Sequence, residues 1–428
     1  MTYRDAIEYL FGLQKYGIKF GLSKTSNLMK AFGNPHHGPV YIHIAGTNGK
    51  GSVAALLETI LINSGLKVGF YSSPHLVRFT ERFRINKQEI RPDVVAHLVG
   101  ELREVIDKKH PPTFFEVTTA MALIYFAREM ADISIMEVGM GGRLDATNIV
   151  RPIISVITNI SLEHQVFLGR RLIDIAGEKA GIIKRGVDLV TAVTQPSIIR
   201  LFKDICAKKN APFWRLGEDA RFRTNGKVLN YFGIKNTFKG LELGLMGRFQ
   251  ARNAALSLAV TELLQMKGYN ISSQHIRDGL KHTIWPGRMH VVSRNPMIIM
   301  DGAHNPGAIR ELASTLERDF QYRRLILVLG IMEDKDIHRM INIIVSTTDF
   351  VIYTRPEYYR SADPAVLRDA ARPLGKSGEI IRNIPDALKR AKEMAGPQDL
   401  ILICGSLFTV GEAMAYFDPE KYQPDGIR

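Results

Sequence analysis

A glycine-rich segment, Gly46-Thr47-Asn48-Gly49-Lys50-Gly51-Ser52, constrains this chain more than any other feature. An apolar run at residues 40–44 precedes it, and apolar residues at the spacing of an amphipathic helix follow it over residues 53–61. A strand, a glycine turn and a helix in this order direct backbone N–H groups and the positive helix end at an anion. Lys50 would then contact the β/γ-phosphates of a nucleotide, and Ser52 would contact Mg²⁺. The segment therefore predicts a phosphate-binding loop.

The match to the common phosphate-loop pattern is incomplete. That pattern has Gly where Ile44 stands and Ser or Thr directly after the lysine, whereas Gly51 separates Lys50 from Ser52 here. A glycine-rich turn that binds nothing is the alternative, and the flanking strand and helix patterns make it the weaker one.

Composition bounds the class of protein. A chain of 428 residues with 45% hydrophobic residues predicts a globular protein of about two or three domains. No apolar run approaches the roughly 18 residues of a membrane span, and the first residues lack the apolar core of a signal peptide. We therefore expect a cytoplasmic protein without a membrane partner. Cys206 and Cys404 are far apart and indicate neither a disulfide framework nor a zinc site.

The net charge of +14 is compatible with nucleic acid, acidic lipid or an anionic small substrate. Lys and Arg are scattered, often in twos, with no long basic tail or interleaved aromatic motif. This distribution argues against a dedicated nucleic-acid-binding arm. A basic surface that attracts ATP and polycarboxylates explains the charge equally well, and for most of these residues a solvated face without a partner is the alternative.

Strand-like and helical runs alternate along the chain, which is typical of a doubly wound α/β fold. The pattern breaks at Trp285-Pro286-Gly287-Arg288, where a second α/β series begins. We therefore expect two domains, residues 1–290 and 291–428. Short aromatic and basic pieces at residues 213–238 predict a small antiparallel addition, and the last dozen residues read as a loose tail. The expected strands are residues 68–71, 134–138, 153–159, 189–192, 297–300, 325–329, 350–354 and 400–404.

Polar residues directly after the apolar runs are the first candidates for a site, because ligands bind at the carboxyl ends of parallel strands. Ser73, Glu137 and His164 stand at such positions. A hydroxyl, a carboxylate and an imidazole beside a phosphate loop suit Mg²⁺ that holds a triphosphate. The ordinary alternatives are a helix-capping carboxylate for Glu137 and a structural histidine for His164.

Several ordered segments resemble folylpolyglutamate synthase/dihydrofolate synthase, within the Mur-type ATP-dependent amide ligases. The resemblance spans residues from about 20 to about 412. It implies a phosphate-loop NTPase-like, doubly wound N-terminal domain and a smaller Rossmann-like C-terminal domain. The matching segments are residues 46–52, 72–76 with Glu81-Arg82, 137–148, 178–182, 301–306 and 405–407.

The resemblance implies ATP-dependent ligation of L-glutamate to dihydropteroate, to reduced folates or to both. ATP would convert a folate carboxylate into an acyl phosphate, and the amine of glutamate would displace the phosphate. Lys50 and Mg²⁺ would screen the repulsion between the anionic carboxylate and the γ-phosphate. The family resemblance suggests two Mg²⁺ ions, a single chain that completes its own site, and hence a monomer.

The family's functional positions carry over residue by residue. Thr47 to Ser52 with Asn253, Arg288 and Asp301 would contact ATP. Ser52, Ser73, Glu137 and His164 would ligate metal, and Lys179 matches a lysine that the family carries as a carbamate. Lys50, Lys179 and His304 would be catalytic. Thr113, Phe115, Arg143 and Asp145 would hold the pterin, and His304 and Ser406 the glutamate. A core aromatic role for Phe115 and helix caps for Asp145 and Ser406 are the alternatives.

The sequence departs from the family pattern at two places, and two alternative functions remain open. Glu163 stands before His164 where Asp is usual, and Met289-His290 stands where the family generally has an acidic residue. A cell-wall precursor ligase is one rival, although only about 40 residues precede the phosphate loop. A nucleotide-switched RNA-binding protein is the other, and it predicts salt-sensitive RNA affinity without glutamate-dependent ATP turnover.

Overall fold

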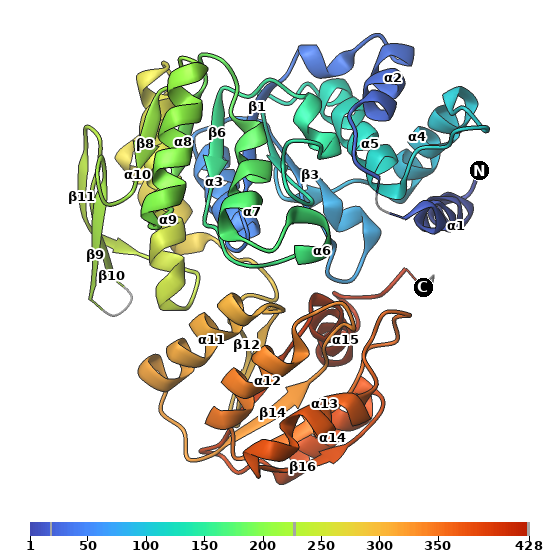
Figure 1. Ribbon diagram of the computed structural model, residues 1–428, viewed down its shortest axis with the longest axis vertical. Helices are drawn as coiled ribbons and strands as arrows, with labels where there is room; N and C mark the ends of the chain where they lie inside the picture. Colours follow the sequence, from blue (N-terminus) through green and yellow to red (C-terminus); the bar gives the residue numbers. More distant parts are fainter. Residues whose placement is uncertain (18, 226–227, 426–428) are drawn as a thin grey trace.

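The computed structural model describes residues 1–17, 19–225 and 228–425. The chain forms an upper part that contains the N-terminus and a lower part that contains the C-terminal residues, each with a sheet of its own (Figure 1). Both parts are α/β, as predicted. Within the described residues, no helix combines the length and the apolar character needed to cross a membrane.

The upper sheet has the strand order β4-β3-β2-β5-β1-β6-β7-β8. The strands from β2 to β8 in this order run parallel, and β3 and β4 add an antiparallel edge. The strands are β1 (Val40–Ala45), β2 (Val68–Tyr71), β3 (Phe83–Ile85), β4 (Gln88–Glu89), β5 (Ile133–Glu137), β6 (Ile154–Ile157), β7 (Asp188–Thr191) and β8 (Phe213–Arg215).

Helices cover both faces of this sheet, which explains why its strands are apolar at nearly every position. Ile42 and Ile44 of β1 belong to the core under α3, α9 and α10, whereas Tyr41 belongs to the core on the opposite face with α5. The helices are α1 (Tyr3–Gly12), α2 (Ser23–Ala31), α3 (Lys50–Asn63), α4 (Pro92–Val105), α5 (Phe114–Arg128), α6 (Gln165–Leu168), α7 (Leu172–Lys179), α8 (Pro196–Lys208), α9 (Arg248–Met266) and α10 (Ser273–His282).

The antiparallel addition predicted for residues 213–238 is only partly correct. β8 extends the upper sheet as a parallel edge strand beside β7. A separate three-stranded antiparallel sheet follows, made of β9 (Arg221–Asn225), β10 (Val228–Phe232) and β11 (Thr237–Glu242).

The lower sheet has the order β12-β13-β17-β14-β15-β16, with β12 antiparallel and the other strands parallel. Its strands are β12 (His290–Arg294), β13 (Met297–Asp301), β14 (Leu325–Leu329), β15 (Phe350–Tyr353), β16 (Ser377–Ile380) and β17 (Leu400–Cys404). Its helices are α11 (Pro306–Asp319), α12 (Ile337–Ile344), α13 (Pro364–Ala371), α14 (Ile384–Met394) and α15 (Leu407–Phe417).

Two further expectations need correction. The helix after the glycine loop, α3, is buried on all sides from Ser52 to Leu61 rather than amphipathic, because α9 and α10 cover the face that would meet solvent. The C-terminal tail is not loose up to Asp425: its carboxylate accepts hydrogen bonds from the Tyr3 hydroxyl at 2.9 Å and from the Phe79 backbone N–H at 2.7 Å. The tail residues after Asp425 lie outside the described part of the chain.

Candidate active site

The glycine-rich segment forms a loop between β1 and α3 that closes around its own lysine. The ammonium of Lys50 donates hydrogen bonds to the carbonyl oxygens of Gly46 at 3.0 Å and Thr47 at 3.3 Å. Gly49 has a φ of 86°, which an L side chain rarely adopts, and a Cβ there would lie 2.6 Å from Oδ1 of Asn253. The loop therefore needs this glycine both for its turn and for the close approach of α9.

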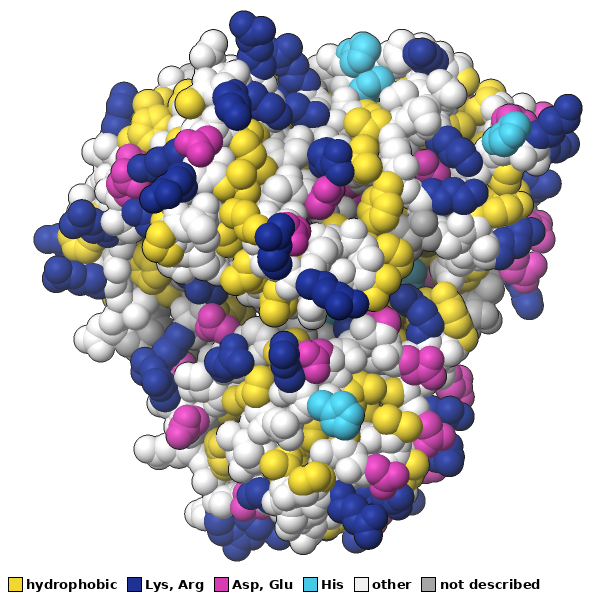
Figure 2. All heavy atoms as spheres, in the orientation of Figure 1, with side chains coloured by type: hydrophobic (Ala, Val, Ile, Leu, Met, Phe, Trp, Pro, Cys, Tyr) yellow, Lys and Arg dark blue, Asp and Glu magenta, His cyan; other side chains and the backbone are white. Residues whose placement is uncertain are grey.

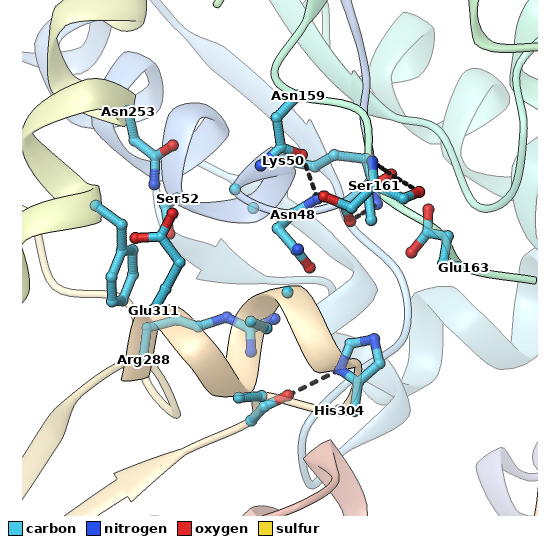
Figure 3. Close-up of a pocket in the computed structure, with 18 of the residues that line it drawn as sticks. Asn48, Lys50, Ser52, Asn159, Ser161, Glu163, Asn253, Arg288, His304 and Glu311 are labelled. Atoms are coloured by element: carbon cyan, nitrogen blue, oxygen red, sulfur yellow. Dashed lines mark hydrogen bonds between the residues drawn. The ribbon is translucent and has the colours of Figure 1, made fainter. Parts of the chain in front are cut away.

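One cavity of about 510 Å³ lies where the loop meets the lower part of the molecule. All nine residues predicted to contact ATP line it, as do four of the five predicted metal ligands, Ser52, Ser73, Glu137 and His164. Figure 3 shows side chains from both parts of the chain pointing into this space. The strand ends thus bring together residues that are far apart in the sequence.

Glu137 ends β5 and faces the cavity beside Ser73, which follows β2. One oxygen of its carboxylate accepts a long hydrogen bond of 3.4 Å from the Ser73 backbone N–H. Burial raises the pKa of Glu137, while the cations Lys50 and Arg288 oppose that shift. A buried carboxylate with so little hydrogen bonding is suited to a cationic ligand.

His164 follows β6 in the left-handed backbone region, with φ 47° and ψ 39°. Residues other than glycine are uncommon there, and such strain concentrates at functional sites. Burial lowers the pKa of His164 to about 4, although Glu163 opposes the shift. The imidazole is therefore neutral at pH 7 and has a nitrogen lone pair available.

Lys179, the fifth predicted metal ligand, lies beneath the phosphate loop and does not line the cavity. Its ammonium donates to the Gly46 carbonyl at 3.0 Å and to Oε1 of Glu163 at 2.9 Å, and its side chain is 2% exposed. Burial lowers the pKa of Lys179 more than Glu163 raises it. Burial opposes the ionisation of Glu163, but Lys179 and Lys50 outweigh it and hold the pKa of that carboxyl at about 2.

The lower part contributes His304 and Asp301 at the end of β13. Nδ1–H of His304 donates to the Gly302 carbonyl at 2.8 Å, an arrangement that leaves Nε2 as an acceptor (Figure 3). Burial lowers the pKa of His304 to about 4, with a further contribution from the Lys335 ammonium. Asp301 accepts backbone N–H groups from Met289 and Ala303, each at 2.8 Å.

Direct contacts join the phosphate loop and α9 to α11. The Asn48 and Asn305 side chains exchange two amide hydrogen bonds, of 2.8 and 3.3 Å. Arg252 of α9 forms an ion pair with Glu311 of α11 at 3.2 Å. The loop that would bind phosphate therefore also contacts the second sheet's unit.

The five predicted substrate residues lie outside this cavity. Thr113 caps α5, Asp145 caps the short 3₁₀ helix Ala146–Ile149, and Ser406 caps α15. The capping alternatives considered for Asp145 and Ser406 are therefore realised in the structure. Arg143 is 59% exposed and pairs with Glu178 at 2.7 Å.

Phe115 is adjacent to the cavity wall. A Cβ on Gly139, which lines the cavity, would lie 2.5 Å from Cζ of Phe115. The ring also packs near Tyr71, with a centroid distance of 6.2 Å. Phe115 is therefore partly a core residue and lies behind the cavity wall.

Lys335 was not predicted as a site residue from the sequence, and Glu163 was predicted only as the neighbour of His164. Glu163 lines the cavity, and the charge of Lys335 acts on both His164 and His304. Lys335 pairs with Asp334 at 2.7 Å. A signal existed, because the polar residues 333–336 directly follow the apolar run of residues 325–332, which contains β14.

Comparison with known proteins gives one consistent family. The Mur ligase middle domain matches residues 44–261, and the Mur ligase glutamate ligase domain matches residues 287–407. The dihydrofolate synthase/folylpolyglutamate synthase of Bacillus subtilis is 34% identical over 424 residues, which cover 96% of this chain and 98% of the relative.

Solved structures similar to this chain belong to the same family. E. coli FolC in complex with DHPP and ADP superposes with a TM-score of 0.89 at 33% identity, covering 98% of this chain and 99% of that chain. A bifunctional folylpolyglutamate synthase/dihydrofolate synthase with Mn, AMPPNP and L-glutamate bound gives 0.85 at 33% identity, covering 96% and 97%. The chain belongs to the dihydrofolate synthase/folylpolyglutamate synthase family of Mur-type ligases and is an ATP-dependent amide ligase.

Proposed function

We propose that this enzyme joins L-glutamate to dihydropteroate, to reduced folates or to both, through an acyl phosphate made with ATP. The observation that carries the proposal is the single cavity shared by the phosphate loop and by His304 of the other unit. Phosphoryl transfer and amide formation need the nucleotide and the amino acid at one point, and this cavity supplies it.

The chain's own cations support the phosphoryl step. Lys50 is fixed by two loop carbonyls, and Arg288 reaches the same cavity from the linker (residues 283–289) between α10 and β12. Backbone N–H groups at the start of α3 add donors for phosphate oxygens. We propose that these groups hold the triphosphate and stabilise the charge that develops on it during transfer.

The predicted metal ligands that line the cavity are suited to a divalent cation. No cluster of three or more His, Cys, Asp or Glu able to hold a metal occurs in the described residues, and the predicted set of Ser52, Ser73, Glu137 and His164 is instead a mixed one. Mg²⁺ is typically held by one or two carboxylates together with phosphates and waters, so a single buried carboxylate beside a phosphate loop is sufficient. When bound, the ion would neutralise phosphate charge. We propose Mg²⁺ as the natural metal and two ions per site.

Lys179 is proposed to react with CO₂. Its amine is buried and its pKa is lowered by burial, so a neutral, nucleophilic form is accessible. The reaction forms one N–C bond and releases one proton, and the resulting anion would have to separate from the Glu163 carboxylate. The product would present oxygen atoms to a metal ion.

The next residues to assign are those that bind L-glutamate and the pterin. His304 presents a neutral Nε2, and the ammonium of Lys335 lies near enough to influence that ring. We propose that these two groups receive L-glutamate, with Ser406 behind them, and that Thr113, Phe115, Arg143 and Asp145 serve the pterin. Residues 1–290 would form the ATP and folate domain, and residues 291–428 the glutamate domain.

The remaining predictions concern partners. Lys and Arg side chains are dispersed among acidic and neutral ones on the face in Figure 2, which supports small anionic substrates rather than nucleic acid. A monomeric state and a cytoplasmic location stay predictions, and gel filtration and cell fractionation would test them.

Phosphate release from Mg-ATP tests the proposed reaction. L-glutamate would be present with dihydropteroate, with tetrahydrofolate or with no acceptor. Release that needs both glutamate and dihydropteroate indicates dihydrofolate synthase activity, and added release with tetrahydrofolate indicates both activities. If no folate stimulates release while ATP binds, the proposed substrate is wrong.

A further inference from the structure

A contact with Trp285 explains why the extra residue between Lys50 and Ser52, Gly51, is a glycine. A Cβ at this position would lie 2.9 Å from Nε1 and 3.0 Å from Cζ2 of Trp285. Gly51 belongs to helix α3 and does not have a positive φ, so its backbone alone would accept alanine. The glycine is therefore required by the indole of the linker, which rests on the first turn of the phosphate-loop helix.

Phe70 and Arg84 contact that indole, and Glu58 pairs with Arg84. We call these three side chains together with Trp285 the linker clamp. The Trp285 and Phe70 rings stack with centroids 5.5 Å apart and an interplanar angle of 26°. The Arg84 guanidinium lies 4.5 Å from the Phe70 centroid and 5.0 Å from that of Trp285. Arg84 also pairs at 2.6 Å with Glu58 of α3, whose side chain is 2% exposed. The clamp thus ties the linker to α3 by both stacking and charge.

The other end of the linker is fixed to the lower sheet. The Gly302 backbone N–H, after β13, donates to the Gly287 carbonyl at 2.8 Å. Between the two anchors, the Arg288 N–H donates to the Trp285 carbonyl at 3.3 Å, which closes a tight turn. Arg288 therefore stands three residues from the clamp, with its side chain in the nucleotide cavity.

We propose that Trp285 is a positioning residue that sets Arg288 relative to the phosphate loop. The indole transmits the position of the first turn of α3 to the linker, so that Lys50 and Arg288 approach the nucleotide as one unit. This inference rests on the proposed role of Arg288 in binding ATP.

The first test measures whether Trp285 acts through Arg288. Trp285→Leu, Arg288→Ala and the double variant of the full chain are compared by kcat and KM for ATP. We expect Trp285→Leu to lower kcat/KM for ATP about tenfold, and Trp285→Phe, which keeps the stack, to stay within about threefold of wild type. The double variant should match Arg288→Ala within about threefold. Losses that multiply would overturn the proposal, because Trp285 would then act independently of Arg288.

The second test addresses the contact with Gly51. Gly51→Ala should weaken ATP binding or folding, and adding Trp285→Leu should relieve the defect to the level of Trp285→Leu alone. Gly100→Ala is the matched control, because Gly100 is also helical and nothing lies within 4 Å of its added Cβ. If Gly51→Ala is as damaging without the indole as with it, the proposal is wrong.

Calorimetric ATP binding to the same variants separates this inference from the proposed function. A wild-type enzyme that binds ATP but turns over no folate would count against the proposed substrates only, and the dissociation constants would still decide between coupling and independence. Failure of the wild type to bind ATP would overturn both.

Discussion

Replacement of Asn305 by serine tests whether the contact between the phosphate loop and α11 supports nucleotide binding. Asn305 does not line the cavity, but its amide exchanges hydrogen bonds of 2.8 and 3.3 Å with Asn48, which does. Its Oδ1 also caps α11 by accepting the Ala308 N–H at 2.9 Å. Serine is an equally good helix cap, so Asn305→Ser removes the contact with Asn48 while it preserves the start of the helix.

The two hydrogen bonds between Asn48 and Asn305 set the expected change in KM for ATP. A net hydrogen bond contributes about 0.5–1.5 kcal/mol, so one good and one long bond contribute about 1.5 kcal/mol together. If this energy holds the two units around the nucleotide, KM for ATP should rise about tenfold, because 1.4 kcal/mol corresponds to a factor of ten. The free energy of unfolding should fall by no more than about 1.5 kcal/mol, since the cap of α11 is kept and only the two bonds to Asn48 are lost.

The assay is phosphate release at varied ATP with glutamate and folate saturating, together with urea unfolding. Asn383→Ser is the matched control, because Asn383 caps α14 by accepting the Asp386 N–H, its amide donates to the Asp386 carboxylate, and it does not line the cavity. The reasoning fails if KM for ATP stays within about twofold of wild type, or if both variants change it equally.

Three further predictions concern charge. The pKa of His304 is about 4, below the ordinary value of 6.5, so its neutral form contributes stability that is present above pH 6.5 and lost as pH falls toward 4. When the pH is lowered from 7.5 to 5, the free energy of unfolding in urea should therefore fall by about 2 kcal/mol less for His304→Gln than for wild type. Equal decreases for the two proteins would contradict this. Lys179→Ala should abolish phosphate release and regain part of it with a short carboxylate but not with chloride, and normal turnover of the variant would argue against a carbamate. Glu137→Gln should raise the Mg²⁺ concentration for half-maximal release about tenfold or more, and an unchanged Mg²⁺ titration would remove Glu137 from the metal site.

The strands and the phosphate loop could be predicted because their signals are local. β2, β14 and β17 have the bounds that the apolar runs predicted, since a parallel strand covered on both faces is a short continuous apolar segment. Ser73, Glu137 and His164 could be placed at one edge for the same reason, because parallel strands bring their carboxyl ends together.

The rest depends on packing between distant segments. The burial of α3 (Lys50–Asn63) depends on helices α9 and α10, which begin only at Arg248 and Ser273. The ion pair between Lys179 and Glu163 and the effect of Lys335 on His304 arise only when loops from different strands meet. Capping by Asp145 could have been suspected from its position before a short helix, but not that its carboxylate would bind the backbone N–H of Met140 and not line the cavity itself.

The phosphate loop takes part in three sets of contacts at once, and this limits how the enzyme can work. It closes around Lys50, it bonds to Asn305 of the second unit, and its helix contacts Trp285 of the linker. A ligand that binds the loop therefore acts on the same residues that hold the two units together. By linkage, ATP should stabilise the arrangement of the units as much as that arrangement favours ATP. Variants that loosen the interface should thus lose ATP affinity before they lose stability, whereas variants in the cores should do the reverse.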